Sequence, residues 1–193
     1  MKDLLILLRP HQWLKNMFIF LPLFFNGQFG NVSLLVKCLW AFVAYCCAAS
    51  AIYCFNDIWD VEADRKHYKK RLRPIASGAV SKTAAYMLMA AMILLSVIIA
   101  ITMCGTGRWA VVMVILFYLC MNIAYCVWLK RIALIDVFVI AVGFVLRVII
   151  GGVATDVWLS HWILIMTFLL ALFLAFAKRR DDVVIYDESG VMA

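Results

Sequence analysis

The sequence predicts an all-α protein, a polytopic transmembrane helix bundle, and three observations carry that prediction. Of the 193 residues, 67% are hydrophobic and only 15% are charged, with a mean hydropathy of +1.02. Soluble domains are roughly 45–50% apolar and about 25% charged. The apolar residues form long continuous runs, and the Lys and Arg residues gather on one side of these runs. The composition therefore excludes a disordered chain, an ordinary cytosolic enzyme and a nucleic-acid-binding module.

Six apolar runs have the length of about 20 residues that a membrane-spanning helix needs. Turn-forming residues such as Asn26-Gly27 and Gly105-Thr106-Gly107 separate them. The runs do not alternate between apolar and polar residues as barrel strands do. We therefore expect one membrane domain over residues 1–193, with spans at roughly 13–29, 34–58, 83–104, 109–129, 133–154 and 160–178.

The distribution of basic residues predicts the orientation of these spans. The net charge is +7, and nearly all of the 18 Lys and Arg residues lie on one side of the spans. The exceptions are Lys37 and Arg108 on the other side and Arg147 inside a span. By the positive-inside rule, we expect both termini in the cytoplasm, a cytoplasmic loop at 57–82 that carries the chemistry, and insertion in the cell (inner) membrane.

Three aspartates, Asp57, Asp60 and Asp64, lie at the predicted end of the second span. Their helical spacing places them on one face of a helix at the membrane boundary. Neighbouring carboxylates repel one another unless a cation or a basic partner joins them. Several oxygen ligands beside a phosphate site suit Mg²⁺, which binds through one or two carboxylates and substrate phosphates. We therefore predict a magnesium site at these aspartates.

Basic residues continue the same spacing at His67, Lys70 and Arg73, and a third cluster containing Lys178 and Arg179 follows the last span. Side chains so placed can hold a phosphorylated ligand next to the metal. The alternative is a juxtamembrane segment that sets orientation or contacts anionic lipid.

The fifth span places Asp136, Gly143 and Arg147 on one face. At 1.5 Å per residue, Arg147 lies about 16 Å deeper than Asp136. A cation at that depth either pairs with a carboxylate of another helix or faces a buried anion site. Gly143 and the nearby Gly151 and Gly152 allow close helix contact or leave room for a ligand, and helix packing is the favoured role.

The segment before the first span contains Gln12, Trp13, Lys15 and Asn16. Trp13 and Lys15 have the character of an interfacial anchor. The polar groups around them are dense for an anchor, so a ligand-binding role stays open.

The segment N-D-x-x-D-x-x-x-D at 56–64 resembles the first aspartate-rich motif of the UbiA superfamily of intramembrane prenyltransferases. Residues 9–16, 60–74 and 130–147 are similar to one branch of it, the decaprenyl-phosphate phosphoribosyltransferases. The position of the second aspartate-rich motif is largely basic here (178–182), which favours a phosphate-rich donor over an aromatic acceptor. Family members usually have more spans, so this chain resembles the fold with its last helices missing.

This resemblance implies Mg²⁺-dependent transfer of 5-phosphoribose from phosphoribosyl diphosphate to a polyprenyl phosphate, for cell-envelope glycan or lipid-linked sugar synthesis. It implies that Asn56, Asp57, Asp60 and Asp64 are catalytic and that the three aspartates hold the metal. Substrate-binding candidates are Gln12, Lys15, Asn16, His67, Lys70, Arg73, Asp136, Arg147, Lys178 and Arg179.

Three alternative functions stay open. One is a polyprenyltransferase that moves a prenyl chain from a polyprenyl diphosphate to an aromatic or lipid acceptor, and another is an inactive truncated membrane scaffold. A small transporter is disfavoured because the charges cluster on one side and only Arg147 lies deep.

Overall fold

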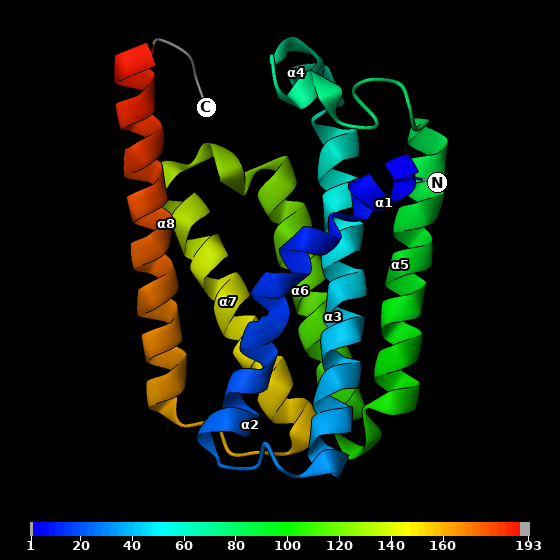
Figure 1. Ribbon diagram of the computed structural model, residues 1–193, viewed down its shortest axis with the longest axis vertical. Coiled ribbons are helices and arrows are strands. Elements are labelled where there is room, and N and C mark those ends of the chain that lie inside the picture. Colours follow the sequence, from blue (N-terminus) through cyan, green and yellow to red (C-terminus); the bar gives the residue numbers. More distant parts are fainter. Residues whose placement is uncertain (1, 190–193) are drawn as a thin grey trace.

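The computed structural model describes residues 2–189, and in this range every regular element is helical and no strand occurs. Five long helices form an upright bundle (Figure 1): α3 (Val32–Trp59), α5 (Lys82–Met103), α6 (Arg108–Val127), α7 (Ala133–Thr155) and α8 (His161–Ser189). The shorter elements are α1 (Lys2–Leu8), η1 (Pro10–Phe20), α2 (Leu21–Phe25), α4 (Val61–Lys66), η2 (Lys70–Leu72), η3 (Gly105–Gly107) and η4 (Leu129–Arg131). The predicted all-α bundle is confirmed.

Five segments within residues 2–189 are long and apolar enough to cross a membrane: Val32–Trp59, Lys82–Met103, Gly105–Val127, Leu134–Thr155 and His161–Asp181. They correspond to five of the six predicted spans.

The remaining predicted span, 13–29, is not one α-helix. It consists of the 3₁₀ helix η1 and the short α2. Pro22 lacks a backbone N–H and lies where the two helices meet. A 3₁₀ helix rises about 2.0 Å per residue, so η1 and α2 together reach on the order of 30 Å. Figure 1 shows this segment descending from the end that holds α1 to the opposite end of the bundle.

The three-residue period of η1 places every third side chain on the same face. The indole of Trp13 donates to Ser50 Oγ at 3.0 Å, and the Asn16 amide donates to Cys46 Sγ at 3.1 Å. Ile19, three residues further, is fully buried in the core. One face of η1 is therefore fixed to α3 along its length.

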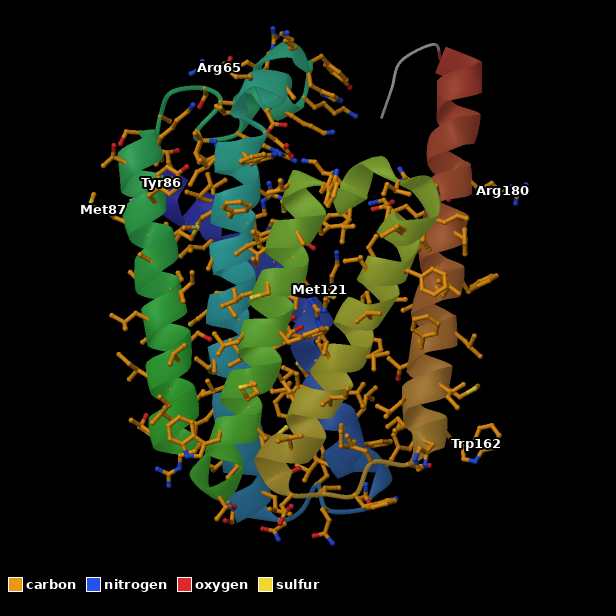
Figure 2. The ribbon with its side chains drawn as sticks, turned by 180° about the vertical axis from the view of Figure 1, so that it is seen from behind. Arg65, Tyr86, Met87, Met121, Trp162 and Arg180 are labelled. Atoms are coloured by element: carbon orange, nitrogen blue, oxygen red, sulfur yellow. The ribbon has the colours of Figure 1, made fainter. Side chains whose placement is uncertain are left out.

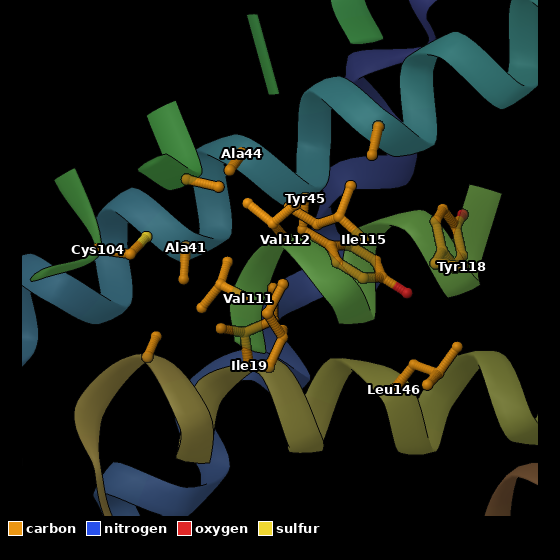
Figure 3. Packing of buried hydrophobic residues seen from close by; sticks show 14 of the residues in the cluster. Ile19, Ala41, Ala44, Tyr45, Cys104, Val111, Val112, Ile115, Tyr118 and Leu146 are labelled. Carbon is orange, nitrogen blue, oxygen red and sulfur yellow. The ribbon is translucent and has the colours of Figure 1, made fainter. Parts of the chain in front are cut away.

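The core is built around α3, which packs against α5, α6, α7 and η1. Small residues on α3, among them Ala41 and Ala44, let these neighbours approach closely (Figure 3). Gly151 on α7 is part of the same packing, because an added Cβ would lie 1.9 Å from the carbonyl oxygen of Ile19. Helix packing, the favoured role for this glycine, is confirmed.

The charged clusters gather at one end of the bundle. Figure 1 places α1, α4 and the end of α8 there, while α2 lies at the other end. The predicted loop 57–82 contains the last turn of α3, then α4 and η2. A second apolar cluster fixes this region to α3 and α5 through Leu7, Cys54, Ile58, Val61, Ile75, Val80 and Ala85.

Candidate active site

Two of the three predicted aspartates converge on a single guanidinium group. Arg73 Nη1 lies 2.7 Å from Asp64 Oδ2 and 3.2 Å from Asp57 Oδ1. Arg9 Nη2 lies 2.6 Å from the same oxygen of Asp57. Asp57 is 2% exposed and Asp64 is 3% exposed, so both charges are almost fully removed from water. The two carboxylates form a buried anionic pair that needs a cation.

The chain folds locally so that each cation reaches this pair. Arg9 has a left-handed backbone conformation, φ 51°, where the chain turns from α1 into η1. Arg73 follows η2, and its position is held by the buried Ile75 and Val80 just beyond it. Both arginines therefore come from turns that the apolar packing fixes against α3.

Asp60 has a different partner. It is the residue between α3 and α4, and its carboxylate forms an ion pair with Lys130 of η4. The neighbouring Asn56 accepts a hydrogen bond from Cys126 Sγ at 3.4 Å. The structure thus brings Asp57 and Asp64 together, whereas Asp60 and Asn56 face the α6–α7 connection.

The arrangement fits a metal site in part. Within residues 2–189, no three His, Cys, Asp or Glu side chains are grouped closely enough to hold a metal ion. Asp57 and Asp64 nevertheless offer two carboxylates around one cation. Mg²⁺ is commonly bound by one or two carboxylates together with substrate phosphates. Arg73 is the cation between them here. Asp60 joins them only if it leaves Lys130.

Asp136 is the centre of a second polar cluster, which links three helices. The Tyr125 hydroxyl on α6 donates to Asp136 Oδ1 at 2.5 Å, and Arg179 on α8 forms an ion pair with Oδ2. Asp136 is buried, while about half of the Arg179 side chain is exposed. Both carboxylate oxygens are therefore occupied, and Asp136 fixes the direction of Arg179. Arg180, next in the chain, points away from the bundle (Figure 2).

Arg147 lies within the bundle and is 7% exposed. Its Nε donates to Asn16 Oδ1 at 2.8 Å, and its Nη1 donates to the Gly143 carbonyl at 2.6 Å. The structure thus brings Gly143 and Arg147 into contact, whereas Asp136, the third residue of the predicted face, contacts Tyr125 and Arg179. A carboxylate partner, one of the two alternatives for Arg147, is not found among the residues that the structure describes.

The remaining candidates lie around these clusters. His67 Nδ1 accepts the backbone N–H groups of Lys69 and Lys70 at 3.2 and 3.4 Å, so the ring shapes the turn into η2. Lys15 is exposed on η1 and directly precedes Asn16, whose side chain contacts Arg147. Gln12 and Lys70 are half-buried.

Sequence reasoning missed three residues of the site: Arg9, Lys130 and Tyr125. Arg9 and Lys130 stand in the motifs at 9–16 and 130–147, and only the folded chain connects them to Asp57 and Asp60. Tyr125 lies inside an apolar run, where no sequence signal separates it from core aromatics.

Comparisons with known proteins show the family of the chain. The model of the UbiA prenyltransferase family matches residues 16–190. The chain is 39% identical over 186 residues to the decaprenyl-phosphate phosphoribosyltransferase of Mycolicibacterium smegmatis, covering 94% of this chain and 57% of the relative. It is 37% identical over 185 residues to the protein of the same name from Corynebacterium glutamicum, covering 95% and 55%. The chain thus spans a little over half the length of these relatives.

A solved structure has the same fold. The UbiA homolog from Archaeoglobus fulgidus bound to DMAPP and Mg²⁺ superimposes with a TM-score of 0.74 at 20% identity, covering 98% of this chain and 67% of that one. The resemblance found in the motifs is confirmed by the family match and the curated relatives. The chain belongs to the UbiA prenyltransferase family.

Proposed function

We propose that the protein is a membrane-bound transferase that moves 5-phosphoribose from phosphoribosyl diphosphate to a polyprenyl phosphate, with Mg²⁺ as cofactor. The observation that carries this proposal is the buried pair of Asp57 and Asp64 held around Arg73 at the cationic end of the bundle. The relatives named decaprenyl-phosphate phosphoribosyltransferase support the choice of donor and acceptor.

The donor diphosphate belongs at the aspartate cluster. Asp57 and Asp64 would hold Mg²⁺, with Asp60 and Asn56 next to them, and the ion would neutralise negative charge on the leaving diphosphate. Arg9 and Arg73 lie against these carboxylates and can donate to phosphate oxygens instead.

Further cations at the same end of the bundle suit the other phosphate groups of the substrates. These are Lys70 on η2 and Lys178 and Arg179 on α8, with Arg179 directed by Asp136. His67, Gln12 and Lys15 complete the proposed binding surface.

The reaction we propose forms one bond and breaks one bond. A phosphate oxygen of the lipid attacks C1 of the ribose, and the bond from C1 to the diphosphate oxygen breaks as diphosphate leaves. The ribose passes through an oxocarbenium-like state, as in other glycosyl transfers. The attacking phosphate is already ionised at neutral pH, so the protein need not supply a general base.

An apolar groove between α7 and α8 has the character that a polyprenyl chain requires. It has a volume of about 290 Å³ and is lined by Val142, Val145, Leu164, Ile165, Phe168 and Leu169. We propose that the lipid tail lies along such apolar walls while its phosphate turns toward the cations.

We also propose that the cationic end faces the cytoplasm, where both termini and the active site would lie. The Lys and Arg residues concentrate at that end, as the positive-inside rule requires of cytoplasmic segments. The water-soluble donor would reach the site from this side of the cell (inner) membrane.

The test is a transfer assay. Protein purified in detergent is incubated with Mg²⁺, phosphoribosyl diphosphate labelled in the ribose, and polyprenyl phosphate, and label is measured in the lipid phase. One of the curated relatives serves as the positive control. We expect label in the lipid with this chain, and its absence while the relative is active would refute the proposed activity. Consumption of polyprenyl diphosphate with an aromatic acceptor would favour the alternative transferase.

Two variants connect the assay to the site. Asp57→Asn removes one carboxylate charge, and we expect transfer to fall by at least about 100-fold, as when other transition-state electrostatic groups are removed. Asp156→Asn is the matched control, because Asp156 is exposed at the far end of the bundle and Asn tolerates its left-handed conformation. Equal activity of the two variants would contradict the metal-site assignment.

A further inference from the structure

Arg147 is a buried cation whose partners in the described residues are all neutral. They are the Asn16 amide, the Gly143 carbonyl and the faces of three aromatic rings. Its Cζ lies 5.1 Å from the ring centre of Tyr45, 5.2 Å from that of Phe144 and 5.8 Å from that of Tyr118. None of the six ion pairs in the described chain includes Arg147.

Neutral partners offset only part of the cost of burying a full charge. Buried charges in proteins are normally paired with an opposite charge, and this is especially so within a membrane domain. The amide, the carbonyl and the rings fix the direction of the guanidinium, but they leave its charge uncompensated. The surroundings of Arg147 therefore have the composition of a site that receives an anion.

A second and independent observation comes from Tyr45. Its side chain is fully buried, yet its hydroxyl has no hydrogen-bond partner within the described residues. A buried hydroxyl without a partner is rare and destabilising. Figure 3 shows Tyr45 on α3 beside Tyr118 of α6, and their ring centres are 4.6 Å apart. The tyrosine whose hydroxyl lacks a partner is therefore one of the aromatic residues that surround the Arg147 guanidinium.

Further cations lie near the aromatic residues that surround Arg147. Lys15 of η1 directly precedes Asn16, whose side chain contacts Arg147, and Lys15 and Lys178 of α8 are both exposed. Neither lysine forms an ion pair with an acidic side chain in the described chain. These two residues give an anion an attractive path toward Arg147.

We propose that Arg147 and Tyr45 form a second anion site, inside the bundle and separate from the aspartate cluster, that binds a phosphate monoester. The guanidinium supplies charge and directed N–H groups, and the Tyr45 hydroxyl donates one further hydrogen bond. Acidic side chains are absent from the described contacts of Arg147, so the site takes a phosphate without a bridging metal.

This inference rests on the proposed function, in which two molecules carry a phosphate monoester. One is the polyprenyl phosphate acceptor, and the other is the 5-phosphate of the donor. The aromatic walls and the position within the membrane domain are compatible with a lipid-linked phosphate. The experiment separates the two sources.

The test uses Tyr45→Phe, which keeps the ring and removes only the hydroxyl. Unfolding of the purified protein on heating is measured without ligand and then with farnesyl phosphate, farnesol or ribose 5-phosphate, in the absence of Mg²⁺. Tyr86→Phe is the matched control, because Tyr86 is an exposed tyrosine on α5 (Figure 2). A ligand that binds the native state raises the unfolding temperature, and the stabilisation grows with the logarithm of the ligand concentration divided by its Kd.

We expect Tyr45→Phe to unfold at a higher temperature than the wild type without ligand, because an unsatisfied buried hydroxyl is lost. We expect its affinity for the phosphate monoester to fall by about tenfold or more. If farnesyl phosphate stabilises the wild type and farnesol does not, the site binds the phosphate of the lipid acceptor. If ribose 5-phosphate stabilises it, the site binds the 5-phosphate of the donor.

The proposal is overturned if neither phosphate stabilises the wild type, or if Tyr45→Phe and Tyr86→Phe respond to them equally. Because this measurement needs no turnover, its failure is distinguishable from failure of the proposed transfer. Binding that depends on Tyr45 in a protein that transfers nothing would refute the proposed reaction alone.

Discussion

Arg73 offers the sharpest test of how the buried carboxylate pair is stabilised. Its guanidinium is the shared partner of Asp57 and Asp64, both almost fully buried. The variant Arg73→Met keeps an apolar side chain of similar length and removes the charge. Asp57 retains Arg9 as a partner, whereas Asp64 has no second ion pair in the described chain. The variant therefore leaves chiefly Asp64 buried without a counter-charge.

The expected loss of stability follows from this geometry. Removing one partner of a buried ion pair typically costs about 3–5 kcal/mol. Arg73 is 25% exposed, so water screens the pair in part, and we expect about 3 kcal/mol. Arg65→Met is the matched control, because Arg65 and Glu62 are both exposed and 3.4 Å apart. Such a surface pair contributes roughly 0–1 kcal/mol.

The assay is unfolding of the purified variants with and without Mg²⁺. Because the carboxylate pair loses its cation in Arg73→Met, we expect Mg²⁺ to stabilise this variant more than it stabilises the wild type. Arg65→Met should respond to Mg²⁺ as the wild type does. If Arg73→Met lost no more stability than Arg65→Met, or gained nothing from Mg²⁺, the claim that the aspartates are a cation site would be wrong.

Four further substitutions, one of them a control, test other parts of the structure. Gly151→Ala forces a Cβ against a backbone carbonyl, and we expect a loss of about 1–3 kcal/mol in the same unfolding assay. Gly30→Ala has open space around it and should change stability by less than about 0.5 kcal/mol. Tyr125→Phe removes the hydrogen bond to Asp136, the carboxylate that directs Arg179. The KM for phosphoribosyl diphosphate should therefore rise while kcat changes little, and the reverse pattern would reject a positioning role for Tyr125. Lys130→Met frees Asp60 from its ion pair, so transfer should reach half its maximum at a lower Mg²⁺ concentration, and an unchanged requirement would leave Asp60 outside the metal site.

Much of the fold could be predicted from the sequence because hydropathy and helix length are local properties. The predicted span 34–58 corresponds to the helix Val32–Trp59, and the predicted span 83–104 corresponds to the helix Lys82–Met103. The segment 13–29 departs from the prediction because prolines interrupt α-helical hydrogen bonding in a stretch that stays apolar. Hydropathy measures the length of such a segment and not its helix type.

The candidate site could be predicted only in part. The spacing of the aspartates predicts the cluster on one continuous helix, whereas in the structure α3 ends and α4 begins at Asp60. At this junction Asp60 has Lys130 as its partner, while Asp57 and Asp64 share Arg73. The pairing of Arg9 with Asp57 joins residues 48 positions apart, so it depends on tertiary packing that local patterns do not encode.

The three-residue repeat of η1 makes this segment unusually sensitive to changes in chain length. An extra residue between Trp13 and Asn16 would rotate everything beyond it by roughly 120° around the helix axis. Asn16 would then turn away from Arg147, and Ile19 would leave the α7 surface at Gly151. Insertions and deletions should therefore be tolerated in the turn at Asn26–Gly30 and rejected within η1. A scan of single-residue insertions along the chain would reveal η1 as a segment whose register is as constrained as that of a β-strand.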